Sequence, residues 1–205
     1  MVPPGLELEE SGDCIAIEGS GLRFTFQRQG ERWEHALSLS NGTGAVAASV
    51  EGDAARDDPA RVVSPAYQEV HRHPADQGFL LLLTGQSGPH HYSAVVTARR
   101  EGRSFIVEFD VADRCRSAVE VLAATYLVRM GSSDLVEAGP DGVVWGGAAV
   151  GQGRLEFGAD ASDSVALAEA GRCAMRVQAL ARIEPSTHTQ RLHYRWRWTP
   201  AENHA

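Results

Sequence analysis

The chain has 205 residues, of which 43% are hydrophobic and 22% charged, and its formal net charge is −8. This length and composition predict one globular domain over residues 1–205. The negative charge argues against the broad basic surface that nucleic acid or an anionic membrane requires, so we expect neither as a partner.

All 19 basic residues are arginine, which excludes Schiff-base chemistry and a phosphate-binding loop lysine. The three cysteines, Cys14, Cys115 and Cys173, are far apart and form no C-x-x-C pair. They predict reduced thiols, and we expect no metal or cofactor. The acidic start MVPPGLELEESGD lacks the features of a signal peptide, and the apolar run at 79–83 is too short for a membrane helix. Together these features predict a cytoplasmic protein.

The N-terminal half alternates with a period of two, which is typical of half-buried strands. Leu22, Phe24 and Phe26 share one face of a predicted strand. After a turn at Gly30, alternate residues from Trp33 onward share one face of the next strand. The pattern closes at the turn signal Asn41-Gly42. Further strands are predicted at 13–18, 45–50, 61–70 and 79–84, with an acidic surface loop at 51–60.

The segments 92–98 and 105–111 predict a β-hairpin around Gly102. In the first, Tyr92 starts the apolar face, so His91 must point to the polar face while His90 lies at the start of the strand. In the second, FIVEFDV, the side chains of Phe105, Val107, Phe109 and Val111 share one face.

The C-terminal segment 191–198, RLHYRWRW, alternates most strictly, with its aromatic side chains on one face. Strands are also predicted at 118–129, 134–138, 142–146 and 173–184. The glycines of 151–158 are assigned to a hairpin. The segment 161–171, ASDSVALAEAG, is the best helix candidate, with a strand pair as the alternative. About a dozen short strands without a break in composition predict an all-β fold, a large antiparallel β-sandwich of two sheets.

The order of strands over 79–129, with SFIVEFDVADR followed by AVEVLAATYLV, resembles galactose-mutarotase-like supersandwich modules, as does the closing LARIEPSTHTQRLHYRWRW. These modules occur as aldose epimerases and as accessory domains of polysaccharide-active enzymes. The resemblance implies a sugar-binding sheet face. In the catalytic members it implies a histidine acid and a glutamate base, for which His91 and Glu184 are the matching positions. The asparagine-rich context of those enzymes is missing here.

Histidines form the first group of candidate site residues. His71 and His73 share one strand face, and they would converge with His90 and His91 if the two strands were neighbours. Histidine suits acid–base work near neutral pH. The alternative is that these histidines are exposed in polar loops.

The second group could hold a sugar. Trp145, followed by two glycines, is the candidate for an exposed stacking platform, with plain packing as the alternative. Tyr92 is a further candidate for ligand binding. The basic row Arg191, His193, Arg195 and Arg197 could bind a carboxylate, a phosphate or an acidic sugar, or could instead pair with acids on neighbouring strands.

Three functions remain open on the sequence. The first is a non-catalytic β-sandwich module that binds carbohydrate or a protein partner through a sheet face. The second is an epimerase-like isomerase, which requires a histidine and a carboxylate facing each other across a cleft. The third is a self-associating structural protein, because long antiparallel sheets offer edges for pairing.

Overall fold

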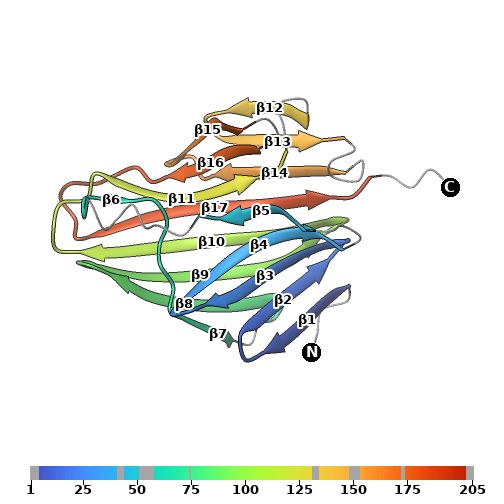
Figure 1. Cartoon of the computed structure of the whole chain (residues 1–205), viewed down its shortest axis with the longest axis horizontal. Helices are drawn as coiled ribbons and strands as arrows, with labels where there is room; N and C mark the ends of the chain where they lie inside the picture. Colours follow the sequence, from blue (N-terminus) through green and yellow to red (C-terminus); the bar gives the residue numbers. More distant parts are fainter. Residues whose placement is uncertain are drawn as a thin grey trace.

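A computed structural model of the chain describes residues 5–40, 44–50, 58–73, 75–130, 134–147, 153–171 and 174–201. Its regular elements are strands, and they form two large antiparallel sheets that lie face to face (Figure 1). The predicted β-sandwich is therefore confirmed. No helix among the described residues has the length and apolar character needed to cross a membrane.

The first sheet has nine strands in the order β1-β2-β3-β4-β5-β11-β16-β15, with β6 added in parallel beside β11. Its strands are β1 (Leu6–Ser11), β2 (Cys14–Gly19), β3 (Leu22–Gln29), β4 (Arg32–Leu39), β5 (Ala45–Ser49), β6 (Arg61–Val62), β11 (Val121–Val128), β15 (Ser164–Gly171) and β16 (Ala174–Leu180).

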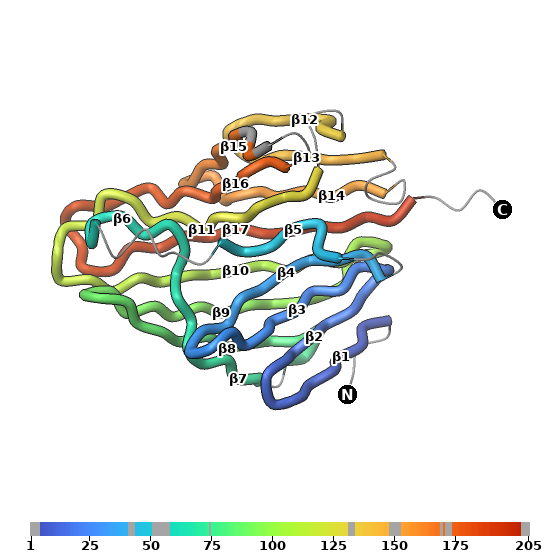
Figure 2. The backbone as a smooth tube through the Cα atoms, in the orientation of Figure 1, coloured from blue at the N-terminus to red at the C-terminus, as the bar shows by residue number. Residues whose placement is uncertain are grey.

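The second sheet has eight strands in the order β12-β13-β14-β17-β10-β9-β8-β7. Its strands are β7 (Glu69–His73), β8 (Phe79–Ser87), β9 (His90–Glu101), β10 (Ser104–Cys115), β12 (Leu135–Gly139), β13 (Gly142–Gly146), β14 (Arg154–Ala159) and β17 (Thr189–Thr199). The backbone trace after β6 crosses from the first sheet to the second before β7 begins (Figure 2).

The core lies between the sheets and follows from the alternation in the sequence. On β10, Phe105, Val107, Phe109 and Val111 are all buried, and the hairpin partner β9 contributes its even-numbered side chains. The aromatic side chains of β17 also point inward, as predicted, and Trp196 is 1% exposed. Since β9, β10 and β17 are adjacent and long, they form the centre of the eight-stranded sheet and fix which residues reach its outer face.

The helix predicted at 161–171 is wrong. Residues Ser164–Gly171 form β15, which pairs with β16 at the edge of the nine-stranded sheet. Val165 and Leu167 are half-buried against the core, so packing decides the conformation over the helix propensity of the alanines.

Besides β15, two strands were absent from the sequence-based prediction, β1 and β14, and the strand predicted at 61–70 forms only at its two ends, in β6 and at the start of β7. In β1 the many glutamates hide the alternation that buries Leu6. In β14 the neighbouring glycines favoured a turn, yet Leu155 and Phe157 are buried.

Some predicted features fall outside the described residues. They are the Asn41-Gly42 turn, most of the acidic loop and Cys173. Cys14 and Cys115 are free thiols, the first half-buried and the second buried.

Candidate functional site

The outer face of the eight-stranded sheet carries the basic row predicted for β17. Arg195 and Arg191 are exposed, whereas His193 and Arg197 are half-buried. Most of the row is paired with acids on neighbouring strands or loops, which was the alternative left open by the sequence. The contacts are Arg191–Asp110 at 3.6 Å, Arg197–Glu101 at 3.2 Å, His193 Nε2–Glu108 Oε1 at 3.4 Å and His193 Nδ1–Asp160 Oδ2 at 2.9 Å.

Arg195 differs from the rest of the row because it forms no ion pair with another described residue. The carboxylate of its cross-strand neighbour Glu108 instead contacts Arg99, with Nη1 of Arg99 at 2.5 Å from Oε2, and His193. Arg195 instead lines a shallow hollow of about 390 Å³ over β12, β13, β14 and β17. Charged side chains surround this hollow, namely Glu137, Asp141, Arg154, Glu156, Arg195 and Arg197.

The floor of this hollow is backbone, because three glycines are aligned across neighbouring strands. Gly139 pairs with Gly142, Gly142 with Gly158, and Gly158 with Arg195. A Cβ at Gly142 would lie 2.8 Å from the Phe157 carbonyl oxygen, so a side chain does not fit there. The result is a flat strip over which the Arg195 guanidinium can contact a ligand from one side.

Two further charged pairs border the strip. Arg154 Nε donates to Glu156 Oε1 at 2.9 Å, and Arg197 is held by Glu101. Because these arginines already have carboxylate partners, Arg195 is the guanidinium of this hollow whose donors are available to an added acid group.

The histidines do not converge as the sequence analysis allowed. β8 lies between β7 and β9, so the two strands are not neighbours. His71 is aligned with Leu82 of β8 and His91 with Gln86, which places them about 13 Å apart along the strands and about 10 Å across them. His71 is exposed and contacts Glu69 at 3.4 Å, and His73 is exposed as well.

His90 and His91 point to opposite sides of the sheet. His91 is exposed on the outer face, as predicted, whereas His90 is 1% exposed inside the sandwich. His90 Nδ1 donates to Asp113 Oδ2 at 2.8 Å, and Nε2 donates to the Pro59 carbonyl oxygen at 2.7 Å. A carboxylate and a carbonyl oxygen accept hydrogen bonds and do not donate them. Both ring nitrogens of His90 therefore carry a hydrogen, which makes the ring an imidazolium. The hydrogen bond that His90 donates to Asp113 raises the pKa of His90.

A second buried histidine, His35, lies among aromatic rings in the middle of the core. Its Nε2 is 2.7 Å from Tyr126 Oη, which in turn is 3.0 Å from Tyr194 Oη. Burial lowers the pKa of His35 to about 3. Its ring is therefore neutral, and this hydrogen-bonded group joins β4, β11 and β17 inside the sandwich.

Two aromatic candidates are not on the surface. Trp145 is 0% exposed, and its ring lies 6.2 Å from that of Trp196, so it is not an exposed platform and instead packs in the core, as the other interpretation of the sequence had it. The alternation of β13 places it on the inner face, where its apolar area is buried. Tyr92 is 3% exposed and stacks on His90 at 5.8 Å. Burial raises the pKa of Tyr92.

The catalytic pair implied by the family resemblance is not brought together. Glu184 lines a hollow with Arg182, His188 and neighbouring residues of the loop before β17. His91 lines a different hollow, with Pro89, Arg114 and Arg116.

Sequence reasoning missed Asp113, Arg114 and Arg116. The signal for Asp113 was present, because an odd-numbered acid in β10 falls on the same face as Phe109 and Val111. An acid at a buried position requires a cationic partner, and His90 occupies the corresponding face of β9. Arg114 and Arg116 gave no signal, since exposed arginines at a strand end are common.

Within the described part of the chain, no three or more histidine, cysteine or acidic side chains are grouped so as to hold a metal ion. No family model and no curated protein matches the sequence.

Proposed function

We propose that the chain is a non-catalytic binding module that holds an acidic carbohydrate on the outer face of its eight-stranded sheet. The ligand group is a carboxylate, and its partner is Arg195 in the hollow floored by Gly139, Gly142 and Gly158. The observation that carries the proposal is the Arg195 guanidinium, which lines this hollow and has no acid partner among the described residues.

The surface favours a charged sugar over a neutral one. Neutral sugars are held largely by stacking on exposed aromatic rings, and the one predicted platform, Trp145, is buried. Arginine, in contrast, binds a carboxylate through two parallel hydrogen bonds. A side-chain-free floor allows a flat pyranose ring to approach the sheet while its carboxylate reaches Arg195.

The same surface is less suited to a stable protein partner. Protein interfaces have an apolar centre, and large exposed apolar patches mark them. Among the described residues, Val95 and Val136 are the large hydrophobic side chains that are exposed, and they lie on different strands, β9 and β12. Leu80 and Leu82 of β8 also lie on this face but are half-buried, and Ile106 of β10 is buried there.

The isomerase alternative has less support. It needs a histidine and a carboxylate with room for a sugar ring between them. His193 and its acids are in direct contact, and His91 and Glu184 line separate hollows. The resemblance to supersandwich modules agrees with the non-catalytic, carbohydrate-binding members of that group.

Isothermal titration calorimetry with oligogalacturonides and with neutral oligosaccharides of equal length tests the proposal. We expect binding of the acidic oligosaccharides only. The variant Arg195→Gln should weaken it roughly tenfold or more, since a charge-assisted hydrogen bond contributes about 1.5–3 kcal/mol. Arg191→Gln is the matched control, on the same strand and face but already paired with Asp110.

Two outcomes would overturn the proposal. One is the absence of any response to acidic oligosaccharides, and the other is an equal loss in the two variants. Light scattering over a range of concentrations tests the self-association alternative in the same samples, and growth of the mean mass with concentration would favour it.

A further inference from the structure

The end of the sandwich at the β8–β9 turn carries a second hollow that the proposed carbohydrate site does not use. It measures about 600 Å³ and is lined by Pro89, His91, Arg114 and Arg116. All but Pro89 are exposed, and none of the four is acidic. Arg114 and Arg116 form no ion pair with another described residue, although the chain as a whole carries a net charge of −8.

The three side chains that can carry positive charge are brought together by strand pairing. His91 of β9 and Arg114 of β10 lie directly opposite each other, and Arg116 follows the end of β10 by one residue. Arg116 is exposed in the bend that follows β10, and it lines the same hollow as Arg114. The guanidinium groups thus border one hollow from two successive positions.

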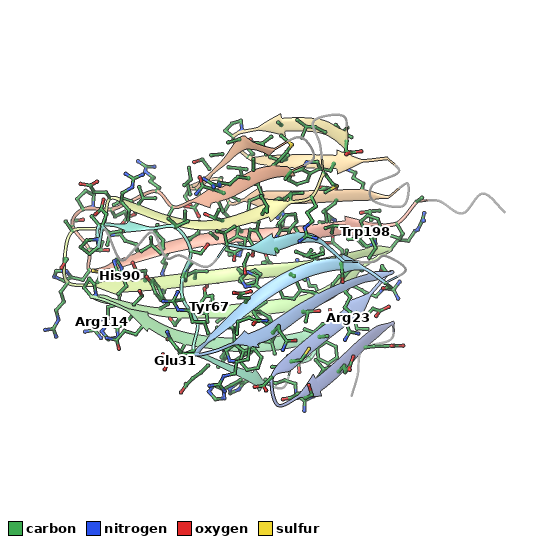
Figure 3. All side chains as sticks on the ribbon, viewed as in Figure 1. Arg23, Glu31, Tyr67, His90, Arg114 and Trp198 are labelled. Atoms are coloured by element: carbon green, nitrogen blue, oxygen red, sulfur yellow. The ribbon has the colours of Figure 1, made fainter. Side chains whose placement is uncertain are left out.

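The acid that belongs to this part of the strand is turned away from the hollow. Asp113 is 0% exposed on the inner face, where the His90 imidazolium neutralises its charge. His90 also holds the Pro59 carbonyl oxygen, so the buried pair fixes the strand ends behind the hollow. Figure 3 shows His90 and Arg114 at this same end of the molecule. The outward carboxylates of β10, Glu108 and Asp110, lie farther along the strand and contact other cations, so they do not compensate Arg114 and Arg116.

From this arrangement we infer that the hollow of Pro89, His91, Arg114 and Arg116 binds a tetrahedral oxyanion, the phosphate or sulfate group of an ester. Two guanidinium groups offer more donors than one carboxylate can accept, and a tetrahedral anion with several terminal oxygens uses them in parallel. The volume of the hollow exceeds that of a single ion, which leaves room for the organic part of the ester.

This site is separate from the hollow at Arg195. Arg114 is aligned with Thr189 of β17, and Arg195 is six residues farther along that strand, which corresponds to about 20 Å. A ligand at one site therefore does not need the other, and variants can distinguish them.

The test is a calorimetric titration of the full chain with inorganic phosphate, inorganic sulfate, glucose 6-phosphate, glucose 6-sulfate and glucuronate. We expect the phosphate and sulfate compounds to bind and glucuronate to bind at least tenfold more weakly. The ester that binds more tightly than its own inorganic ion shows whether the natural ligand is a phosphate ester or a sulfate ester. Glucuronate binding as tightly as the esters in the variant Arg195→Gln, in which the carbohydrate hollow has lost its guanidinium, would overturn the inference.

Variants locate the site. Arg114→Gln and Arg116→Gln should each weaken binding roughly tenfold or more, on the strength of a charge-assisted hydrogen bond. Arg176→Gln, an exposed arginine of β16 on the other sheet, is the matched control and should leave it unchanged. Equal losses in all three variants would indicate nonspecific attraction and overturn the inference. A loss of phosphate and sulfate binding in Arg195→Gln alone would also overturn the inference, because it would place the anion in the carbohydrate hollow. If acidic sugars fail to bind at Arg195, the proposed function fails but the present test is unaffected.

Discussion

Two histidines are buried among the described residues, His35 and His90, and they have opposite charge. His35 lies between aromatic rings and beside the Tyr126 hydroxyl, and burial keeps its ring neutral. His90 lies between a carboxylate and a carbonyl oxygen, and these acceptors keep its ring protonated. The comparison shows that burial alone does not decide the charge of a histidine. The hydrogen-bond partners that the fold provides decide it.

The largest expected effect is on the charged histidine. Asp113→Asn removes the carboxylate and leaves a buried imidazolium without its partner, which costs about 3–5 kcal/mol in free energy of unfolding. Asp110→Asn, three residues earlier on β10, is the matched control, because its pair with Arg191 is exposed and contributes under about 1 kcal/mol. Urea unfolding measures both. Similar losses in the two variants would mean that the His90 ring is not charged.

The next effect concerns the neutral histidine. Its folded pKa is depressed below the ordinary 6.5, so unfolding takes up a proton in acid, and the stability present above pH 6.5 is lost as the pH falls. Between about pH 6.5 and 5 the expected loss is about 2 kcal/mol, from about 1.4 kcal/mol per pH unit. Urea unfolding over this range measures the slope.

His35→Gln keeps an amide beside the Tyr126 hydroxyl but does not titrate, so its slope over this range should be shallower, whatever its absolute stability. His188→Gln, an exposed histidine, is the control and should keep the wild-type slope. Parallel slopes for wild type and His35→Gln would show that His35 is protonated in the folded protein.

The smallest effect is in mild alkali and has the opposite sign. The folded pKa of His90 is raised, so its stabilisation is complete below the ordinary 6.5 and is lost as the pH rises through the folded pKa. We expect the free energy of unfolding of the wild type to fall above about pH 6.5, and we expect a smaller fall in Asp113→Asn. Tyr92 deprotonates only above its ordinary pKa of about 10, so measurement below pH 9 excludes it. A flat wild-type profile would contradict the charged state.

The fold class followed from the sequence because period-two alternation is a local signal. Segments such as 105–111 and 191–198 show which side chains are buried without knowledge of their neighbours, and the structure confirms both. The exceptions are instructive. In 161–171 the alanines favour a helix in isolation, and only pairing with β16 makes the segment a strand.

The candidate sites depended on strand order, which the sequence does not contain. The histidine cluster that the sequence left open does not form, because β8 lies between β7 and β9. The glycine floor beside Arg195 depends on the register of β12, β13, β14 and β17, which aligns Gly139 and Gly142 with Gly158 and Arg195 from later in the chain. Arg195 itself was a candidate from the start, but its lack of a partner is a property of the assembled face.

The sequence by itself determined an all-β sandwich, the inward face of its central strands and the outward direction of His91 and Arg195. These properties are set by alternation within one strand, which is encoded locally. The tertiary structure decided the charge of His35 and His90, the burial of Trp145 and the grouping of His91 with Arg114 and Arg116. Those properties need side chains from separate strands to meet, and pairing and packing across the two sheets bring them together.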